Sequence, residues 1–197
     1  MSQIREFLRA MRLVIILWII TAIACPLITL AIGQIAFPVR ANGSLLQDGR
    51  GAIVGSALIG QPFTSDRYFW SRPSAISYST TPDASVTGIS GASNLAPSNP
   101  ELGDRIEGEI NRLKLAGIKP TADLVYTSGS GLDPHISLEA ARNQIVRVAE
   151  ARGLDSNQVE ILITKYTEGR FLGIFGEPGV NVLQLNLALD EVSDSQS

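Results

Sequence analysis

The residues that could do chemistry are few in this chain of 197 residues, in which His135 is the only histidine and Cys25 the only cysteine. A single imidazole and a single thiol exclude a disulfide within the chain, most zinc sites and every catalytic scheme that needs two imidazoles. His135 follows Gly-Leu-Asp-Pro, and we interpret it as a loop or cap residue. We therefore predict no catalytic residue and no metal ligand.

Motifs that bind phosphate or present a nucleophile are also missing. The sequence contains no Gly-x-x-x-x-Gly-Lys-Ser/Thr loop and no Gly-x-Ser-x-Gly elbow. One enzymatic interpretation stays open, a membrane-anchored Ser/Lys hydrolase with Ser44 as nucleophile and a lysine whose pKa is lowered by burial. The available lysines are Lys114, Lys119 and Lys165. Each has charged neighbours in a predicted helix or turn, which favours a solvated lysine over a buried base.

Residues 13–39 form an apolar run without a charged residue or histidine, and this run is expected to anchor the rest of the chain. Roughly 20 apolar residues cross a bilayer core, so we predict a transmembrane helix over residues 13–36. Three arginines and one glutamate precede the run, which favours a cytoplasmic location for residues 1–12. The alternative is a cleaved signal, whose apolar core spans only about 7 to 15 residues. We favour the uncleaved anchor because the run is longer.

The remainder is predicted to form a single extracytoplasmic α+β domain at residues 40–190, followed by a disordered tail at 191–197. Thirteen basic and eighteen acidic residues follow the apolar run and give this part a net charge of −5. That charge argues against nucleic acid or anionic lipid as its main partner. Strands are predicted at 52–59, 124–126 and 180–189. Helices are predicted from Pro100 with a cap at Ser98 or Asn99, from a cap at Ser137 to Arg152 with Gly153 as terminator, and from near Ser156.

Two features of the domain bear on function. Tyr68, Phe69 and Trp70 form an aromatic cluster that we interpret as core at a sheet edge. Residues 71–100 are rich in Ser, Pro, Gly and Asn and nearly free of charge, a composition typical of flexible segments. Because this stretch lies inside the domain, we interpret it as an ordered loop that lines a surface.

Short segments rich in Gly, Asn, Ser and Pro recur along the chain and suit close docking against another protein. With two more regular segments they form an ordered set: 42–45, 56–61, 68–75, 91–100, 128–137, 144–152 and 180–190. In this set the chain resembles the C subunit of the bacterial Kdp potassium-transporting P-type ATPase. The resemblance covers nearly the whole sequence, including the N-terminal span.

The resemblance implies a place in an ATP-driven, high-affinity potassium import complex of the bacterial plasma membrane. In that family one subunit is channel-like and another is a P-type ATPase that forms an aspartyl-phosphate. This chain has neither a Thr-Val-Gly-Tyr-Gly filter nor an Asp-Lys-Thr-Gly motif. It is therefore expected to be a non-catalytic accessory subunit without a tightly bound cofactor, in which ATP and potassium belong to the complex.

Two roles follow from the resemblance. The first is a catalytic chaperone that raises the ATP affinity of the ATPase subunit, with Gln144 as nucleotide contact. An extracytoplasmic domain cannot meet cytoplasmic ATP directly, and this argues against the first role. The second is assembly, or potassium access, at the external mouth of the channel-like subunit. For this role we predict docking through residues 88–100, with Ser93, Asn94, Ser98 and Asn99 as contacts. An independent single-span binding or sensor domain remains the alternative.

Overall fold

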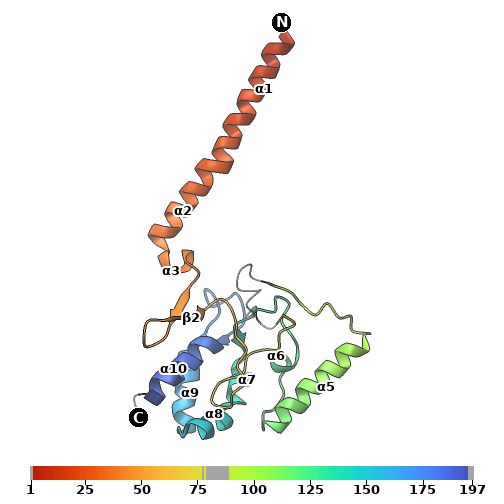
Figure 1. The fold of residues 1–197 in the computed structure, drawn as a ribbon, viewed down its shortest axis with the longest axis vertical. Coiled ribbons are helices and arrows are strands. Elements are labelled where there is room, and N and C mark those ends of the chain that lie inside the picture. The colour runs from red at the N-terminus through yellow and green to blue at the C-terminus, as the bar shows by residue number, and fades with distance from the viewer. Residues whose placement is uncertain (1, 77, 79–88, 195–197) are drawn as a thin grey trace. The chain divides into compact units, whose positions relative to one another are not determined.

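The structure, a computed structural model, describes residues 2–76, 78 and 89–194. The chain divides into two compact units, Met1–Leu45 and Leu46–Ser197. The first is dominated by a long helix and the second mixes helices with short strands (Figure 1). The predicted α+β class is confirmed.

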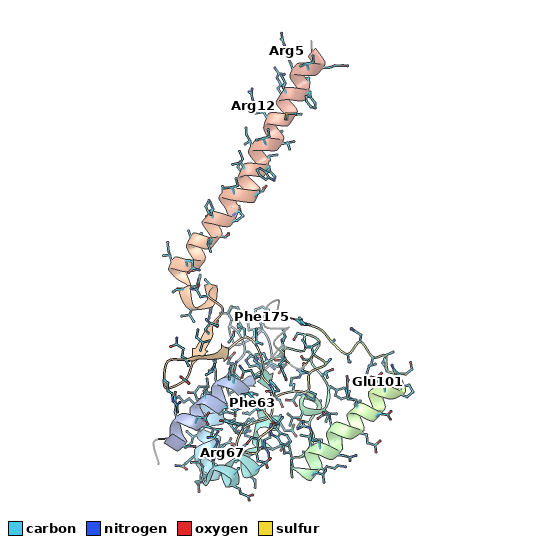
Figure 2. All side chains as sticks on the ribbon, in the orientation of Figure 1. Arg5, Arg12, Phe63, Arg67, Glu101 and Phe175 are labelled. Atoms are coloured by element: carbon cyan, nitrogen blue, oxygen red, sulfur yellow. The ribbon has the colours of Figure 1, made fainter. Side chains whose placement is uncertain are left out.

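The N-terminal unit begins with three helical segments that follow one another without a break: α1 (Ser2–Ile19), η1 (Ile20–Ala24) and α2 (Cys25–Ala36). The continuous helix Gln3–Ala36 is long and apolar enough to cross a membrane, with a mean hydropathy of 2.7. It confirms the predicted apolar helix and extends it toward the N-terminus. Arg5 and Arg12 project from its first turns (Figure 2). The short helix α3 (Pro38–Ala41) follows.

The segment η1 is a π-helical turn that ends two residues before Pro26. Proline has no N–H to donate to the carbonyl four residues earlier, and its ring clashes with that carbonyl. The N–H of Cys25 donates instead to the oxygen of Ile20, five residues back. The wider turn accommodates Pro26 and keeps the helix continuous.

The strands are short, and those of the larger sheet are antiparallel. A two-stranded sheet joins β1 (Leu45–Gln47) to β2 (Ile53–Ser56), and a three-stranded sheet has the order β3 (His135–Ile136), β5 (Gly179–Asn181), β4 (Thr167–Glu168). In the second sheet, His135 pairs with Asn181 and Glu168 pairs with Gly179. The predicted strand at 52–59 is confirmed only for residues 53–56.

Six helices of this unit are described: α5 (Pro100–Leu115), α6 (Ala122–Val125), α7 (Leu138–Arg142), α8 (Ile145–Arg152), α9 (Ser156–Lys165) and α10 (Val182–Asp194). The predicted caps are confirmed, since the side chain of Asn99 accepts from the Glu101 N–H and that of Ser137 from the Ala140 N–H. Gly153 ends α8 with a φ of 68°, a left-handed conformation that suits glycine.

The prediction of a strand over 180–189 is wrong beyond Asn181. Alternating apolar residues suggested a strand, but Val182, Leu185 and Leu189 also share one helical face, and all three are buried. The Asn181 side chain starts the helix by accepting from the Gln184 N–H at 3.2 Å. Helix α10 then continues to Asp194, so 191–194 are helical where a disordered tail was expected; residues 195–197 lie outside the described part.

Two further elements differ from prediction. Residues 124–126 were expected to be a strand, but the short helix α6 ends there, with the Tyr126 N–H bonded to the Ala122 oxygen. Residues 137–152 were expected to be one helix and form two, α7 and α8. The break follows from a tight turn in which the Gln144 N–H donates to the Ala141 oxygen. This turn directs the Gln144 side chain into the core.

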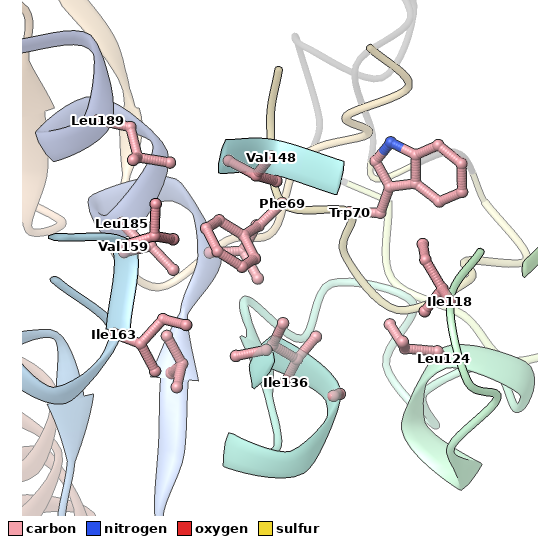
Figure 3. Packing of buried hydrophobic residues seen from close by; sticks show 14 of the residues in the cluster. Phe69, Trp70, Ile118, Leu124, Ile136, Val148, Val159, Ile163, Leu185 and Leu189 are labelled. Carbon is pink, nitrogen blue, oxygen red and sulfur yellow. The ribbon is translucent and has the colours of Figure 1, made fainter. Parts of the chain in front are cut away.

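The core of the second unit is built around Phe69, which is fully buried (Figure 3). Leu185 of α10, Val148 of α8 and Ile136 of β3 surround it in the same cluster. Trp70 lies farther along, close to Ile118 and Leu124 in this view (Figure 3). The interpretation of the aromatic cluster as core is therefore confirmed for Phe69 and Trp70. Both residues lie in an irregular segment that follows β2, and not in a strand.

Candidate functional site

Gln144, the predicted nucleotide contact, lies at the start of α8 and is completely buried. Its side-chain amide pairs with the backbone of Trp70. The Trp70 N–H donates to Oε1 at 2.8 Å, and Nε2 donates to the Trp70 carbonyl at 3.3 Å. Nε2 also donates to the Ala140 carbonyl, and Arg147 Nη2 donates to Oε1 at 2.8 Å. The amide is thus fully engaged inside the domain.

Asn186 of α10 makes the same kind of contact with the backbone of Phe69, the residue before Trp70. The Phe69 N–H donates to Asn186 Oδ1 at 2.8 Å, and Nδ2 donates to the Phe69 carbonyl at 3.0 Å. Asn186 is 1% exposed. Two buried amides from different helices therefore satisfy both backbone groups of Phe69 and Trp70, as a neighbouring strand would do. We call this arrangement, made of Gln144 and Asn186 around residues 69–70, the amide clamp.

Two arginines extend the amide clamp to the preceding residues. Arg147 donates to the carbonyls of Asp66 and Tyr68 at 2.8 and 3.0 Å. Arg152 has a fully buried side chain and pairs with Asp190 at 2.8 Å. Its guanidinium also lies over the Tyr68 ring. An irregular segment gains backbone partners that a sheet would otherwise supply, which stabilises it as a rigid part of the core.

Two guanidinium groups lie over the ring of Trp70. The Arg112 guanidinium lies 4.5 Å from the ring centre and that of Arg147 lies 4.3 Å from it. Burial lowers the pKa of Arg147 to about 10. Arg147 therefore stays charged at neutral pH, and both stacked cations are favourably placed over the indole.

A pocket of about 290 Å³ opens beside Trp70, lined by Phe63, Arg72, Tyr78 and Arg112 among others. Its two guanidinium groups already have carboxylate partners, because Arg72 pairs with Asp133 at 2.7 Å and Arg112 with Glu109 at 2.8 Å. Burial raises the pKa of Tyr78 to about 12, so its phenol is neutral. The pocket therefore presents an aromatic wall with compensated charges.

His135 stands on β3, where a loop or cap was expected. Its Nδ1 is 3.7 Å from Asp133 Oδ1, and its Nε2 is 3.3 Å from Glu168 Oε2 on β4. The ring crosses β5 at Gly179, where a Cβ would come within 3.3 Å of the His135 Cβ. Interaction with Asp133, and to a lesser extent with Glu168, raises the pKa of His135 against the opposing effect of partial burial.

The predicted docking residues lie together in one loop. Asn94 and Ser98 are exposed, while Ser93 and Asn99 are partly buried. Asn94 has a φ of 52°, and its Nδ2 donates to the Ala92 carbonyl at 3.3 Å. Asn99 caps α5 through its side chain. Residue 88, the start of the predicted docking segment, lies outside the described residues.

The loop is fixed at its first residues. The Gly91 N–H donates to the Ser130 carbonyl at 2.8 Å, and Ser90 Oγ donates to the same oxygen at 3.0 Å. Gly131 packs closely against this loop, and a Cβ added at Gly131 would lie 2.5 Å from the Gly91 oxygen. Two of the segments that carried the family resemblance, 91–100 and 128–137, therefore touch.

The sequence indicated Gln144 and the loop at 88–100 as candidate sites, but it did not indicate the partners of Gln144. Asn186 and Arg147 were passed over because each stood in an apolar pattern that was assigned as a whole element. A buried asparagine within an apolar run is the signal that would have identified Asn186. The Ser/Lys hydrolase interpretation requires a buried lysine, and Lys114, Lys119 and Lys165 are all exposed.

Comparison with known proteins decides the family. The family profile described as K+-transporting ATPase, c chain (KdpC), matches residues 7–191. The chain belongs to the KdpC family. The Potassium-transporting ATPase KdpC subunit of Synechocystis sp. is 64% identical over 188 residues, which cover 95% of this chain and 99% of the relative. The KdpC subunit of Microcystis aeruginosa is 60% identical, with 100% of both chains covered. The KdpC subunit of Paraburkholderia phytofirmans is 54% identical, with 90% of this chain and 92% of the relative covered.

As a KdpC chain, the protein is the non-catalytic C subunit of the Kdp potassium-transporting ATPase complex, with a single membrane helix. The resemblance noted in the sequence is confirmed. Membership in the complex implies other Kdp subunits as partners.

Proposed function

We propose that this KdpC chain supports assembly of the potassium import complex, with its globular unit on the extracytoplasmic side and the loop at 89–100 in contact with a partner subunit. The partners are a channel-like, potassium-binding subunit and an ATP-hydrolysing P-type subunit. The observation that carries the proposal is that the loop is exposed yet anchored. An anchored loop loses little conformational entropy on binding, which favours a stable contact.

The anchors lie at both ends of the loop. Gly91 and Ser90 are bonded to the Ser130 carbonyl at one end, and Asn99 caps α5 at the other. Between them Asn94 presents an amide to solvent from a left-handed backbone. Asparagine adopts this conformation more readily than most residues, so the turn is retained without strain.

Charge supports the proposed side of the membrane. Arg5, Arg9 and Arg12 precede the apolar run against a single Glu6, and such a surplus tends to stay in the cytoplasm. The part that follows has a net charge of −5. Near a cation pathway this charge raises the local cation concentration modestly, because screening limits its reach to about 8 to 10 Å.

A role as catalytic chaperone that raises the ATP affinity of the ATPase subunit remains a prediction, as does a nucleotide contact at Gln144. A nucleotide that reached this amide would have to displace hydrogen bonds to Trp70, Ala140 or Arg147. If ATP affinity depends on Gln144, we expect the effect to pass through the amide clamp and the surface that it supports.

The experiment is recovery of the complex with a variant loop. Asn94→Gly removes the amide and keeps the left-handed backbone, and Asn99→Ser shortens the second side chain and keeps the helix cap. We expect the double variant of the full chain to retain fewer partner subunits in mild detergent than the unaltered chain. Asn111→Ser, an exposed asparagine on α5, is the matched control and should retain them all.

Two results would contradict the proposal. Unchanged recovery of the complex with the double variant would remove the loop as a contact. Failure of the unaltered chain to recover partners, in cells that express them, would instead favour an independent single-span binding or sensor domain.

A further inference from the structure

The connection between β4 and β5 carries an unusual concentration of exposed apolar side chains. Phe171, Leu172, Ile174 and Phe175 are 71%, 74%, 72% and 62% exposed. We call residues 171–175 the apolar tip. Four large apolar residues within five positions form a contiguous patch, and such patches mark contact with a partner or a membrane. Phe175 and Arg67 lie at opposite ends of the globular unit (Figure 2).

The apolar tip is folded rather than loose. The N–H of Phe171 donates to the Phe175 carbonyl at 2.8 Å, and the N–H groups of Ile174 and Phe175 both donate to the Phe171 carbonyl. Gly173 N–H donates to the Arg170 carbonyl at 3.0 Å. Four backbone donors of the tip are therefore satisfied locally, which lowers the cost of moving it into a medium without water.

Charge is confined to the base of the apolar tip. Arg170 and Glu177 flank it and pair with each other at 3.1 Å. The five residues between Arg170 and Gly176 carry no charge. Leu172 has a φ of 54°, a left-handed conformation that is uncommon for a leucine, within a tight turn. An uncharged apolar end above a neutralised base suits the interface of a lipid bilayer.

A bilayer is always within reach of this unit. The membrane helix ends at Ala36 and the globular unit begins at Leu46. Residues 37–45 span about 30 Å even when fully extended. The tether therefore keeps the apolar tip at a high effective concentration relative to the membrane surface.

We propose that the apolar tip inserts into the headgroup–acyl boundary of the same bilayer that holds the membrane helix. The contact is hydrophobic and needs no anionic lipid, because the flanking charges are paired. It gives the globular unit a second membrane attachment, which restricts its rotation about the tether. The inference rests on the membrane helix and does not depend on the loop at 89–100.

The test uses the full chain in vesicles, without other subunits. In a Cys25→Ser background, a nitroxide label is placed by Ile174→Cys in the tip or by Leu115→Cys at the end of α5, where Leu115 is 90% exposed. Relaxation of each label by oxygen, which partitions into lipid, is compared with relaxation by a water-soluble nickel chelate. We expect a severalfold higher oxygen-to-nickel ratio at position 174 than at position 115.

The expected ratio is the same in pure phosphatidylcholine and in vesicles with added phosphatidylglycerol, and it stays constant from about 0.1 M to about 0.5 M salt. Adding Phe171→Ser and Phe175→Ser should lower it to the value at position 115. Equal, water-like ratios at both positions would overturn the proposal. A label that is water-exposed in vesicles and shielded only in the complete complex would also overturn it, in favour of docking on a partner subunit.

Discussion

The side-chain amide of Gln144 forms four hydrogen bonds of 2.8 to 3.3 Å, all within the chain. A single residue thereby supplies the donor and acceptor that an irregular segment of the core requires. Gln144 was noticed in the sequence only through the family resemblance, because its own neighbours give no hint of burial. Its partner Trp70 is 74 positions away, and such a pairing exists only in three dimensions.

Removal of the amide by Gln144→Ala is predicted to lower the free energy of unfolding by about 2 to 4 kcal/mol, since buried groups of Trp70 lose their partners. Urea denaturation of the full chain in detergent, followed by tryptophan fluorescence, measures it. Asn186→Ala should act similarly, because it unpairs Phe69. A Gln144→Ala chain of unchanged stability that nevertheless lowers ATP affinity in the complex would refute the structural role and favour a direct nucleotide contact.

His135 is predicted to make stability depend on pH. Its pKa is raised in the folded state, so the folded chain binds the imidazole proton more tightly than the unfolded chain does. The resulting stabilisation is complete below about pH 6.5 and is lost as the pH rises through the raised pKa. The facing groups are Asp133, its partner Arg72, and Glu168.

The effect should stay under about 1 kcal/mol, because the site is partly exposed and screened. Unfolding measured between pH 6 and pH 8 should show this decline for the unaltered chain and not for His135→Gln. Equal pH profiles for the two chains would contradict the assignment.

At the scale of elements, local signals predicted starts and stops better than element type. Asn99, Ser137 and Gly153 marked helix ends correctly, because a cap depends on a few neighbouring residues. The type of 180–189 was misjudged because its apolar residues fit both a period of two and a helical face. Packing of Leu185 and Leu189 around Phe69 selected the helix, and that contact spans more than a hundred residues.

Helix α9 offers a direct test of capping. Asp155 accepts from the Asn157 N–H at 2.7 Å, and Gln158 closes the capping box by accepting from the Asp155 N–H. Asp155→Ala is predicted to cost about 1 kcal/mol in the free energy of unfolding, measured in urea. Asp155→Asn keeps a capping oxygen and should cost much less. An equal loss for both variants would mean that the cap contributes little and the charge accounts for the effect.

At the scale of the whole molecule, one apolar helix was predictable from composition, and one α+β unit from the order of the expected strands and helices. The helix is evident because no charged residue interrupts residues 13–39. The amide clamp and the apolar tip were not predictable from the sequence, since both depend on which segments meet or remain uncovered after folding. The contact between 91–100 and 128–137 has the same origin.

Orientation is predicted to place the N-terminus in the cytoplasm and the globular unit outside. In a Cys25→Ser background, Leu115→Cys should react with a membrane-impermeant maleimide in intact spheroplasts, and Gln3→Cys should react only after lysis. The reason is the arginine surplus before the apolar run. Labelling of position 3 in intact spheroplasts, with position 115 protected, would reverse the topology and remove the argument against direct contact with cytoplasmic ATP.

The most direct test of the assembly role is a mild-detergent purification of the tagged full chain from potassium-starved cells, with mass spectrometry of the proteins that accompany it. We expect a P-type ATPase subunit and a channel-like subunit in constant ratio to this chain, with less of both when Asn94→Gly and Asn99→Ser are combined. Recovery of this chain alone, from cells shown to express both partners, would contradict a role in assembly of the complex.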